Sequence, residues 1–244
     1  MEYSYEEHII YENIKINEDI YKIIIKGEFK GKPGQFYMLR AWDDEPILSR
    51  PISINYINKD EISFLYKVCG KGTQILKKLK KGDSILLTGP LGNGFKIEEY
   101  TGKIAVVSGG IGIAPMEYLV KSIKNQFIDL YVGFKEESYT LDNYKDYVDN
   151  TYIATESGKE GHKGYILDIL NPKEYDLVLC CGPEILMKKV VEKCKISNTK
   201  VFVSMEKKMA CGVGACLVCT CKTKDGNKRT CKDGPVFNGE DLEY

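Results

Sequence analysis

Short apolar runs separated by Gly, Pro, Asn and Asp fill the N-terminal part of the chain. Runs of this kind, rich in Ile, Tyr, Phe and Leu, are typical of β-strands. Strands are expected at residues 20–26, 35–40, 51–56, 62–68 and 84–88. Short strands at this spacing predict an antiparallel barrel or sandwich. One helix is expected at residues 73–80, with Thr73 as its cap and Gly82 after its end.

The pattern changes after residues 90–94, where apolar strands begin to alternate with helices, and this places the domain boundary near Tyr100. The expected strands are residues 103–108, 128–134, 151–155, 176–181 and 200–204, and the expected helices are residues 115–124, 165–170 and 183–194. Such alternation predicts a doubly wound parallel sheet with helices on both faces. We therefore expect a β-barrel domain at 1–99, an α/β domain at 100–204 and a small cysteine-rich module at 205–244.

The composition is that of a globular chain rather than a disordered one. Hydrophobic residues make up 43% of the 244 residues and charged residues 29%. Lys plus Arg total 35 and Asp plus Glu also total 35, so no basic field favours nucleic acid. The N-terminal segment lacks the order of a signal peptide, and no apolar run approaches the roughly 18 residues of a membrane helix. We expect a cytoplasmic protein with no membrane association.

The nine cysteines are the most informative feature of the composition, because five of them fall between Cys211 and Cys231. Cys211, Cys216 and Cys219 have the spacing C-x4-C-x2-C, and Cys231 follows as a fourth. This is the spacing of plant-type [2Fe–2S] sites. Glycines between the first two cysteines let the backbone wrap closely around a small inorganic core. These four cysteines are the candidate cluster ligands.

Zinc is the competing interpretation, because four thiolates also bind zinc tetrahedrally. Structural zinc sites usually have two short C-x2–4-C turns, whereas this chain has one tight loop and one separate cysteine. The spacing therefore favours iron and sulfide. Cys221 competes with Cys219 as a ligand, and the two-residue spacing favours Cys219.

Three segments of the barrel domain suit a flavin dinucleotide. Arg50 offers a fork of donors to a pyrophosphate, Ser53 offers a hydroxyl, and Thr73 lies at a glycine-rich helix start where an anion can bind. Each segment alone is also consistent with an ordinary turn or cap, but their order within one domain favours the flavin. The candidate FAD-binding residues are Arg50, Pro51, Ile52, Ser53, Leu65, Tyr66, Lys67, Gly72 and Thr73.

Two glycine-containing turns follow strands of the α/β domain, where open parallel sheets bind ligands. The alternative is that both are ordinary tight turns. The first turn departs from the G-x-G-x-x-G dinucleotide pattern. Acidic residues after the expected strand 128–134 lean toward NAD rather than NADP. The candidate NAD-binding residues are Gly109, Gly110, Gly112, Ala114, Pro115, Cys181, Gly182 and Pro183.

The order of these motifs resembles the ferredoxin–NADP reductase superfamily. With the loop that ends at Cys216, the chain is similar to the electron-transfer subunits of class 1B dihydroorotate dehydrogenases. The resemblance implies FAD in the barrel, NAD as co-substrate and a [2Fe–2S] cluster on the four cysteines. It also implies a catalytic partner subunit that contains FMN and oxidises dihydroorotate in pyrimidine biosynthesis, in a heterotetramer of two copies of each. Electrons would then flow from that FMN through the cluster and FAD to NAD⁺.

Two further consequences follow from this resemblance. The segment 222–230 is expected to form a shortened hairpin before Cys231. We also expect the cluster near a surface that faces the partner, with Val236 and Phe237 contributing to that interface.

Two other functions remain open at this stage. One is the small subunit of a sulfide dehydrogenase or an NADH-dependent ferredoxin–NADP oxidoreductase, which would share the architecture. The other is a non-enzymatic zinc-binding adaptor. Only His8 and His162 are present, and neither belongs to a recognisable catalytic triad. We expect no acid–base catalytic residue, because in a relay the cofactors carry the chemistry.

Overall fold

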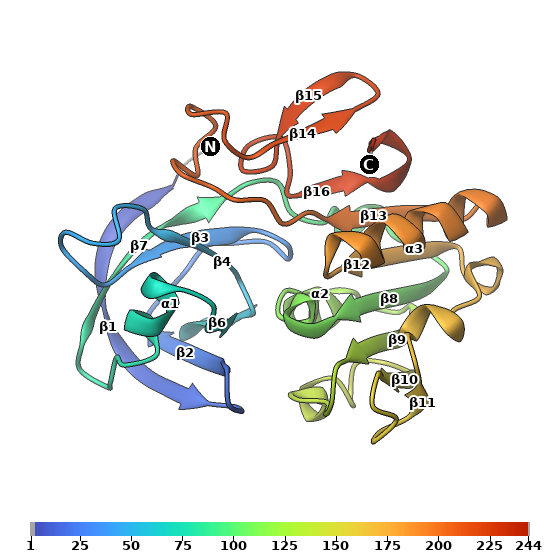
Figure 1. The fold of residues 1–244 in the computed structure, drawn as a ribbon, viewed down its shortest axis with the longest axis horizontal. Coiled ribbons are helices and arrows are strands. Elements are labelled where there is room, and N and C mark those ends of the chain that lie inside the picture. Colours follow the sequence, from blue (N-terminus) through green and yellow to red (C-terminus); the bar gives the residue numbers. More distant parts are fainter. Residues whose placement is uncertain (1–2, 244) are drawn as a thin grey trace.

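Two sheets lie side by side in the computed structural model, and the C-terminal segment lies across both of them (Figure 1). The structure describes residues 3–243, so Met1 and Glu2 of the N-terminal segment considered above lie outside it. Within these residues, no helix has the length and apolar character needed to cross a membrane.

The first sheet is antiparallel and has seven strands in the order β4-β3-β7-β1-β2-β6-β5. Its strands are β1 (Ser4–Lys15), β2 (Ile20–Lys26), β3 (Phe36–Arg40), β4 (Arg50–Ser53), β5 (Tyr56–Ile57), β6 (Glu61–Lys67) and β7 (Ser84–Leu91). The short link between β4 and β5 closes the sheet. There the N–H of Ile54 donates to Gln35 O (3.0 Å) and the N–H of Asn55 donates to Ser63 O (2.9 Å). The expected antiparallel barrel is confirmed.

Two details of this barrel differ from the expectation. Strand β1 has no recognisable apolar pattern, because Ile10 is its only fully buried residue and polar residues occupy many of its other positions. The helix α1 (Lys71–Leu76) starts before Thr73, and its N-cap is Gly70. The Thr73 hydroxyl accepts hydrogen bonds from the N–H groups of Cys69 (2.9 Å) and Gly70 (3.1 Å). Thr73 therefore supports the turn from inside the helix, and its assignment as the cap is wrong.

The second sheet is mainly parallel, with the order β11-β10-β9-β8-β12-β13-β16. Its strands are β8 (Lys103–Gly109), β9 (Phe127–Phe134), β10 (Asn150–Thr155), β11 (His162–Lys163), β12 (Leu177–Cys181), β13 (Lys200–Ser204) and β16 (Val236–Asn238). Because β8 lies beside β12, the chain winds outward in both directions from this pair. The predicted doubly wound sheet is confirmed.

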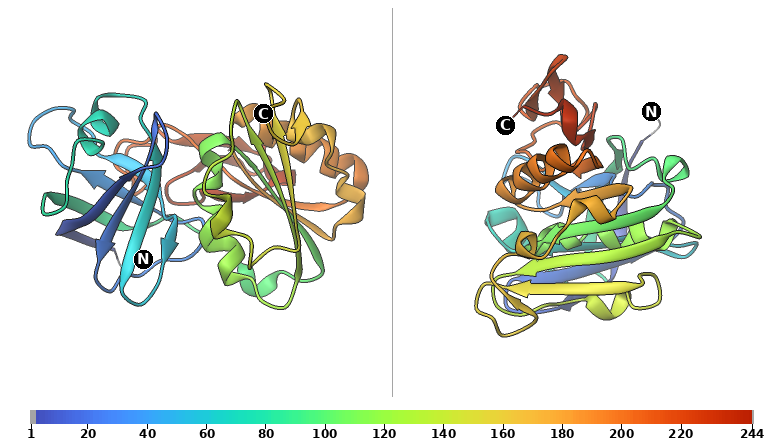
Figure 2. Two further views of the ribbon diagram at one scale, coloured as in Figure 1. Left: turned by 90° about the horizontal axis from the view of Figure 1, so that it is seen from below. Right: turned by 90° about the vertical axis from the view of Figure 1, so that its right-hand side faces the viewer.

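Helices cover both faces of this sheet, as the left-hand view in Figure 2 shows. Helix α2 (Met116–Ser122) packs on the face toward the barrel, and α3 (Glu184–Ser197) packs on the other face. The helix expected at 165–170 is only a short 3₁₀ helix, Ile166–Asp168. Further 3₁₀ turns are Ile97–Glu99, Gly110–Ile113, Leu141–Asn143, Pro172–Glu174 and Gly239–Asp241.

The last segment of the chain belongs to both halves of the molecule. The strands β14 (Thr220–Thr223) and β15 (Gly226–Arg229) form a separate hairpin, which confirms the hairpin expected at 222–230. Strand β16 then pairs antiparallel with β13 at the edge of the parallel sheet. The C-terminal segment is therefore attached by main-chain hydrogen bonds rather than by side chains alone.

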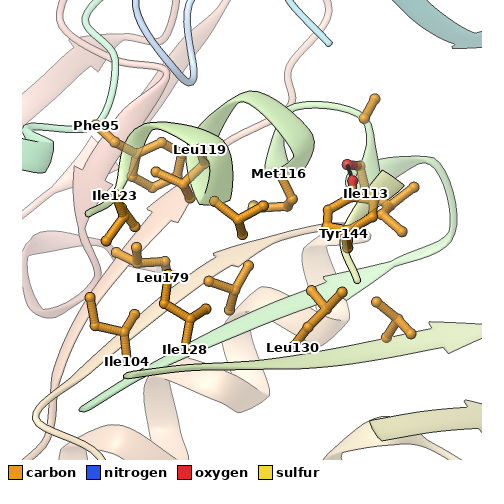
Figure 3. Packing of buried hydrophobic residues seen from close by; sticks show 14 of the residues in the cluster. Phe95, Ile104, Ile113, Met116, Leu119, Ile123, Ile128, Leu130, Tyr144 and Leu179 are labelled. Atoms are coloured by element: carbon orange, nitrogen blue, oxygen red, sulfur yellow. Dashed lines mark hydrogen bonds between the residues drawn. The ribbon is translucent and has the colours of Figure 1, made fainter. Parts of the chain in front are cut away.

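One apolar cluster joins the two sheets. Ile20, Leu65 and Phe95 from the barrel side pack with α2 and with the strands beneath it. Figure 3 shows Phe95 beside Leu119 of α2, above the sheet residues. Burial of apolar side chains from both sides stabilises the relative placement of the two sheets.

We expect Leu119→Ala to lower the free energy of unfolding by about 3 kcal/mol, because a fully buried leucine leaves both a transfer loss and a cavity. Urea unfolding followed by circular dichroism measures the change. Ile196→Ala is the control on α3, where the side chain is 84% exposed, and it should change the free energy by less than about 0.5 kcal/mol. Equal effects of the two substitutions would contradict the packing described here.

Candidate functional site

The four candidate ligands of the cysteine loop form two pairs. The N–H of Cys216 points at Cys211 Sγ (3.5 Å), and the N–H of Cys231 points at Cys219 Sγ (3.4 Å). Among residues 3–243, no group of three or more Cys, His, Asp or Glu side chains is gathered around a single point. Two pairs of thiolates fit a [2Fe–2S] cluster, in which each iron takes two cysteines.

The glycines of the loop are required by its close packing. Gly212 and Gly214 have φ values of +73° and +85°, a conformation that other residues rarely adopt. A Cβ on Gly212 would lie 2.9 Å from Met38 Cγ, and a Cβ on Gly214 would lie 2.7 Å from Lys232 Cδ. The loop therefore has no room for side chains at these two positions.

The buried pair of cysteines rests on the barrel. Cys219 and Cys231 are each 2% exposed and pack with Phe36, Met38 and Leu91. These three residues come from β3 and β7, so the barrel provides the floor of the cysteine site. We call Phe36, Met38 and Leu91 the barrel floor.

Cys221 lies elsewhere, although it is only two residues from Cys219. Its side chain packs in the apolar cluster around Met205 and Leu242, on the α3 side of the parallel sheet. Burial raises the pKa of the Cys221 thiol. This environment supports its interpretation as a structural residue rather than a ligand.

The two pairs of cysteines differ in their electrostatic surroundings. Partial burial opposes ionisation of Cys211, but hydrogen bonds from backbone N–H groups, first that of Cys216 and then that of Val213, lower its thiol pKa to about 6. Burial raises the pKa of Cys231 to about 12, with a further contribution from Cys219. The Cys211 thiol is thus already suited to form a thiolate. The Cys231 thiol needs a bound cation to do so.

Two residues that the sequence analysis missed hold the loop in place. Arg229 forms an ion pair with Asp233 (Nε–Oδ2, 3.0 Å) and its Nη1 donates to Gly214 O (3.3 Å). Asn93, which follows β7, donates from Nδ2 to the carbonyl oxygens of Lys232 (3.0 Å) and Asp233 (3.2 Å). Both act on backbone groups far away in sequence, so no local motif identifies them.

One side of the loop is open and apolar. Cys216 is exposed, and the next two residues, Leu217 and Val218, are 61% and 57% exposed. Val236 and Phe237, expected at a partner interface, belong to β16 and pack against the apolar clusters on the two faces of the parallel sheet. The strand is half-buried at the edge of that sheet, and its contribution to a partner interface stays a prediction.

The candidate flavin residues Arg50 and Gly72 lie together although they are far apart in sequence. A Cβ on Gly72 would lie 2.8 Å from Arg50 Cζ, so the guanidinium group covers this glycine directly. The same guanidinium group lies 5.5 Å from the ring centre of Trp42 and donates to Leu48 O. A groove of about 550 Å³ lies along α1, and its walls include Pro46, Gly70, Lys71 and Gln74 but neither Arg50 nor Gly72.

The side chains of the other candidate flavin residues are buried, half-buried or paired with another residue. Leu65 is buried between the two sheets, and Tyr66 is buried in the barrel with its hydroxyl 3.4 Å from Asn13 Oδ1. Lys67 is exposed and pairs with Asp19 (3.2 Å). Pro51, Ile52 and Ser53 lie on β4 and are half-buried. A donor fork at Arg50, a glycine beneath it and accessible strand edges suit a flavin dinucleotide.

The two candidate nicotinamide loops meet where β8 and β12 end, which is the point where the strand order reverses. Open parallel sheets bind ligands at such a point. A Cβ on Gly112 would lie 2.6 Å from Gly182 Cα and would overlap Cys181 O, so the two loops touch there. Gly110, with φ +53°, has no atom within 4 Å of the position of its missing Cβ, so its surroundings are open.

A row of small polar groups faces the barrel at this end of the sheet. Cys181 lies in register between Ser108 and Ser204 on the neighbouring strands. Burial raises the pKa of the Cys181 thiol to about 12, so this group is a neutral thiol near neutral pH. Within residues 3–243 the buried Ser108 hydroxyl has no hydrogen-bond partner, which suits a site that a polar ligand completes.

The remaining nicotinamide candidates have other positions. Gly109 ends β8 against Leu186 and Pro183, and Pro183 is the N-cap of α3. Ala114 and Pro115 are buried at the start of α2, where the Ala114 carbonyl accepts from Asn55 Nδ2 (2.8 Å). These four residues therefore pack within the two loops that lead into α2 and α3.

Comparison with known proteins identifies the family. A model described as the iron-sulfur cluster binding domain of dihydroorotate dehydrogenase B matches residues 206–243. The dihydroorotate dehydrogenase B (NAD(+)) electron transfer subunit of Clostridium acetobutylicum is 60% identical over 242 residues, which are 99% of this chain and 98% of that protein. This chain belongs to the family of dihydroorotate dehydrogenase B electron transfer subunits. The family predicted from the motifs is thereby confirmed.

Other relatives agree with this family. The subunit of the same name from Clostridium perfringens is 51% identical over 248 residues, with 100% of each chain covered. The structure of an NADH-dependent reduced ferredoxin-NADP oxidoreductase matches with a TM-score of 0.88 at 29% identity, over 97% of this chain and 90% of that chain. A ferredoxin NADP⁺ reductase from Neisseria gonorrhoeae shares the fold alone, with a TM-score of 0.63 at 15% identity, over 79% of this chain and 91% of that chain.

We expect Gly112→Ala to lower the free energy of unfolding by about 2 to 3 kcal/mol, because the new methyl group forces the two nicotinamide loops apart. Gly110→Ala is the matched control. It meets open space and should cost only about 1 kcal/mol for its left-handed backbone. Urea unfolding of both variants makes the comparison, and a larger loss for Gly110→Ala would contradict the packing of the loops.

Proposed function

We propose that this chain relays electrons between NAD(H), FAD and a [2Fe–2S] cluster, and that it serves a catalytic subunit that oxidises dihydroorotate and contains FMN. The arrangement of the cysteines carries the proposal: one pair of thiols is buried against the barrel and the other pair lies toward the surface, in a chain of this family. FAD, when bound, accepts two electrons as a hydride and releases them singly, which links a nicotinamide to a one-electron cluster.

The proposed ligands of each group come from separate elements. Cys211, Cys216, Cys219 and Cys231 would hold the two irons. Arg50, Ser53, Lys67, Gly72 and the backbone around them would hold FAD. The turns at Gly109–Gly112 and Cys181–Pro183 would bind NAD. The other candidate residues, Pro51, Ile52, Leu65, Tyr66, Thr73, Ala114 and Pro115, would shape these sites.

The placement of these elements supports a relay. The cysteine loop lies on the barrel, and the strand that follows it joins the parallel sheet, so one segment connects the flavin and nicotinamide halves. The neutral Cys181 thiol and the Ser108 hydroxyl line the end of the sheet that faces the barrel. Such groups can orient a nicotinamide by hydrogen bonds without adding charge.

The direction of flow proposed here is from dihydroorotate through the partner's FMN, the cluster and FAD to NAD⁺, as a step of pyrimidine biosynthesis in the cytoplasm. Nine free cysteines suit a reducing compartment. The stoichiometry of two copies of each subunit stays a prediction. The acidic residues Glu136 and Glu137 after β9, both paired with Lys159, support NAD over NADP.

The main alternative is the small subunit of an NADH-dependent ferredoxin–NADP oxidoreductase, because that architecture matches over nearly the whole chain. Identity of 60% and 51% to dihydroorotate dehydrogenase subunits, against 29% for that structure, favours the first function. Co-purification with a tagged copy of this chain separates them. Recovery of an FMN protein that oxidises dihydroorotate supports the proposal, and recovery of a large partner resembling glutamate synthase overturns it.

We expect Cys219→Ala to abolish iron and acid-labile sulfide binding, because it removes one ligand of the buried pair. Cys221→Ala is the matched control, and it should retain both at the wild-type level, since this thiol lies in a different apolar cluster. The measurement is metal and sulfide content after anaerobic purification. Loss of the cluster in Cys221→Ala, or stoichiometric zinc in the wild-type protein, would contradict the assignment.

The open apolar side of the cysteine loop leads to a prediction about the partner. Replacing Leu217 and Val218 with serine should weaken binding of the catalytic subunit by about 10- to 100-fold, because it removes exposed apolar area that the partner would bury. Calorimetric titration measures the affinity. Ile196→Ser, on the exposed face of α3, is the control and should leave the affinity within twofold of wild type. Unchanged binding of the double variant would place the interface elsewhere.

A further inference from the structure

Asn55 is a buried polar residue at the junction of the two sheets. It lies between β4 and β5 and is 1% exposed. Toward its own barrel it bonds twice to Ser63: its N–H donates to Ser63 O (2.9 Å), and its Oδ1 accepts from Ser63 Oγ (3.2 Å). With its Oδ1 on the Ser63 side, the amide directs its Nδ2 away from the barrel.

The other two polar groups of Asn55 bond to the α/β half. Its Nδ2 donates to Ala114 O (2.8 Å), and its backbone carbonyl accepts from the N–H of Tyr118 (3.0 Å). Tyr118 lies in the first turn of α2, where N–H groups have no partner within the helix. A residue of the barrel therefore caps a helix of the neighbouring sheet and also holds the loop that leads into it.

Contacts around Asn55 stabilise the same junction. The Tyr118 hydroxyl donates to Gly31 O (3.1 Å) in the barrel. The Glu117 carboxylate, almost fully buried, lies 3.8 Å from Lys22 Nζ of β2 and 2.8 Å from Lys121 Nζ. The first turn of α2 is thus attached to the barrel at several points, and Asn55 supplies the most buried of them.

The position of Asn55 gives these bonds a functional meaning. It follows Ser53, the end of the proposed flavin strand, by two residues, and its acceptor Ala114 follows Gly112 of the proposed nicotinamide loop by two. Two short and rigid segments therefore connect the two proposed cofactor sites through one hydrogen-bonded side chain. A shift of Asn55 would therefore change the positions of both sites.

We propose that Asn55 is a positioning residue that sets the distance between the nicotinamide loop and the flavin strand. This inference rests on the proposed function. Hydride exchange between a nicotinamide and a flavin, one proton with two electrons, requires the reacting atoms to approach within about 3 to 3.5 Å, and an error of 1 Å can cost about 100-fold in rate. Asn55 acts on the rate of that exchange and leaves the affinity of either cofactor site largely unchanged.

Three variants of the full chain test this role. Asn55→Ala removes both side-chain bonds. Asn55→Asp keeps the size and the bond from Ser63, but its carboxylate cannot donate to Ala114 O. Ser63→Ala is the matched control, because it removes only hydrogen bonds inside the barrel, those from Ser63 Oγ to Asn55 Oδ1 and to Tyr56 O. Each variant is assayed for flavin and iron content, for NADH affinity, for the rate of flavin reduction at saturating NADH, and for hydrogen exchange at the Tyr118 amide.

Both Asn55 variants should retain flavin and iron and bind NADH within about threefold of wild type. Their flavin reduction should be about 10- to 100-fold slower, and Tyr118 exchange should be faster. Ser63→Ala should resemble wild type in both rates. Flavin reduction within twofold of wild type in either Asn55 variant, or an equal slowing in Ser63→Ala, would overturn the proposal. Loss of flavin from both Asn55 variants would also overturn it, by assigning Asn55 to flavin retention.

The exchange measurement separates this inference from the proposed function, because it needs no nicotinamide. If the wild-type chain showed no flavin reduction by NADH, the proposed function would fail. Faster Tyr118 exchange in Asn55→Ala than in Ser63→Ala would still support the junction described here. Equal exchange in the two variants would contradict it.

Discussion

The packing of the cysteine loop on the barrel floor is the interaction on which the rest of the structure depends. Cys219 and Cys231 are buried against β3 and β7, and the chain continues directly into β16 of the other sheet. The cysteine site is therefore fixed to the flavin half by apolar contact and to the nicotinamide half by main-chain hydrogen bonds. Electron relays need such fixed and short separations, because their protein component contributes placement rather than chemistry.

The two halves of the molecule build their proposed dinucleotide sites from different backbone arrangements. The barrel offers an arginine over a glycine, while the parallel sheet offers two touching glycine turns at the point where its strand order reverses. The proposed function gives both arrangements the same role, which is to present backbone N–H groups to a dinucleotide. The apolar cluster around α2 and the hydrogen bonds of Asn55 then hold these two sites in one orientation.

Much of the fold could be predicted from the sequence because its signals are local. The strands 103–108 and 200–204 are buried on both faces and read as continuous apolar runs, which the structure confirms as β8 and β13. The strand β1 could not be recognised, because only Ile10 on it is fully buried. The three residues of β16 form a strand only because β13 offers a free edge, which is a long-range property.

The features of the candidate site also fall into those that local patterns predict and those that depend on tertiary contacts. The cysteine spacing and the glycine turns are local patterns, whereas the pairing of the cysteines depends on how the loop folds back against the hairpin. Arg229 and Asn93 donate hydrogen bonds to backbone carbonyls that are distant in sequence. Asn55 lies in the short link between β4 and β5, and its role becomes visible only from its hydrogen bond to the carbonyl of Ala114. Such residues act through tertiary contacts that no spacing rule describes.

The most direct test of the account is the path of electrons through this chain alone. The anaerobically purified protein would be reduced with NADH, and separately with dithionite, while flavin absorbance and the low-temperature electron paramagnetic resonance spectrum are recorded. The account predicts that NADH bleaches the flavin and produces the signal of a reduced [2Fe–2S] cluster, which dithionite brings to one per chain. A protein that shows no iron–sulfur signal with either reductant would contradict it.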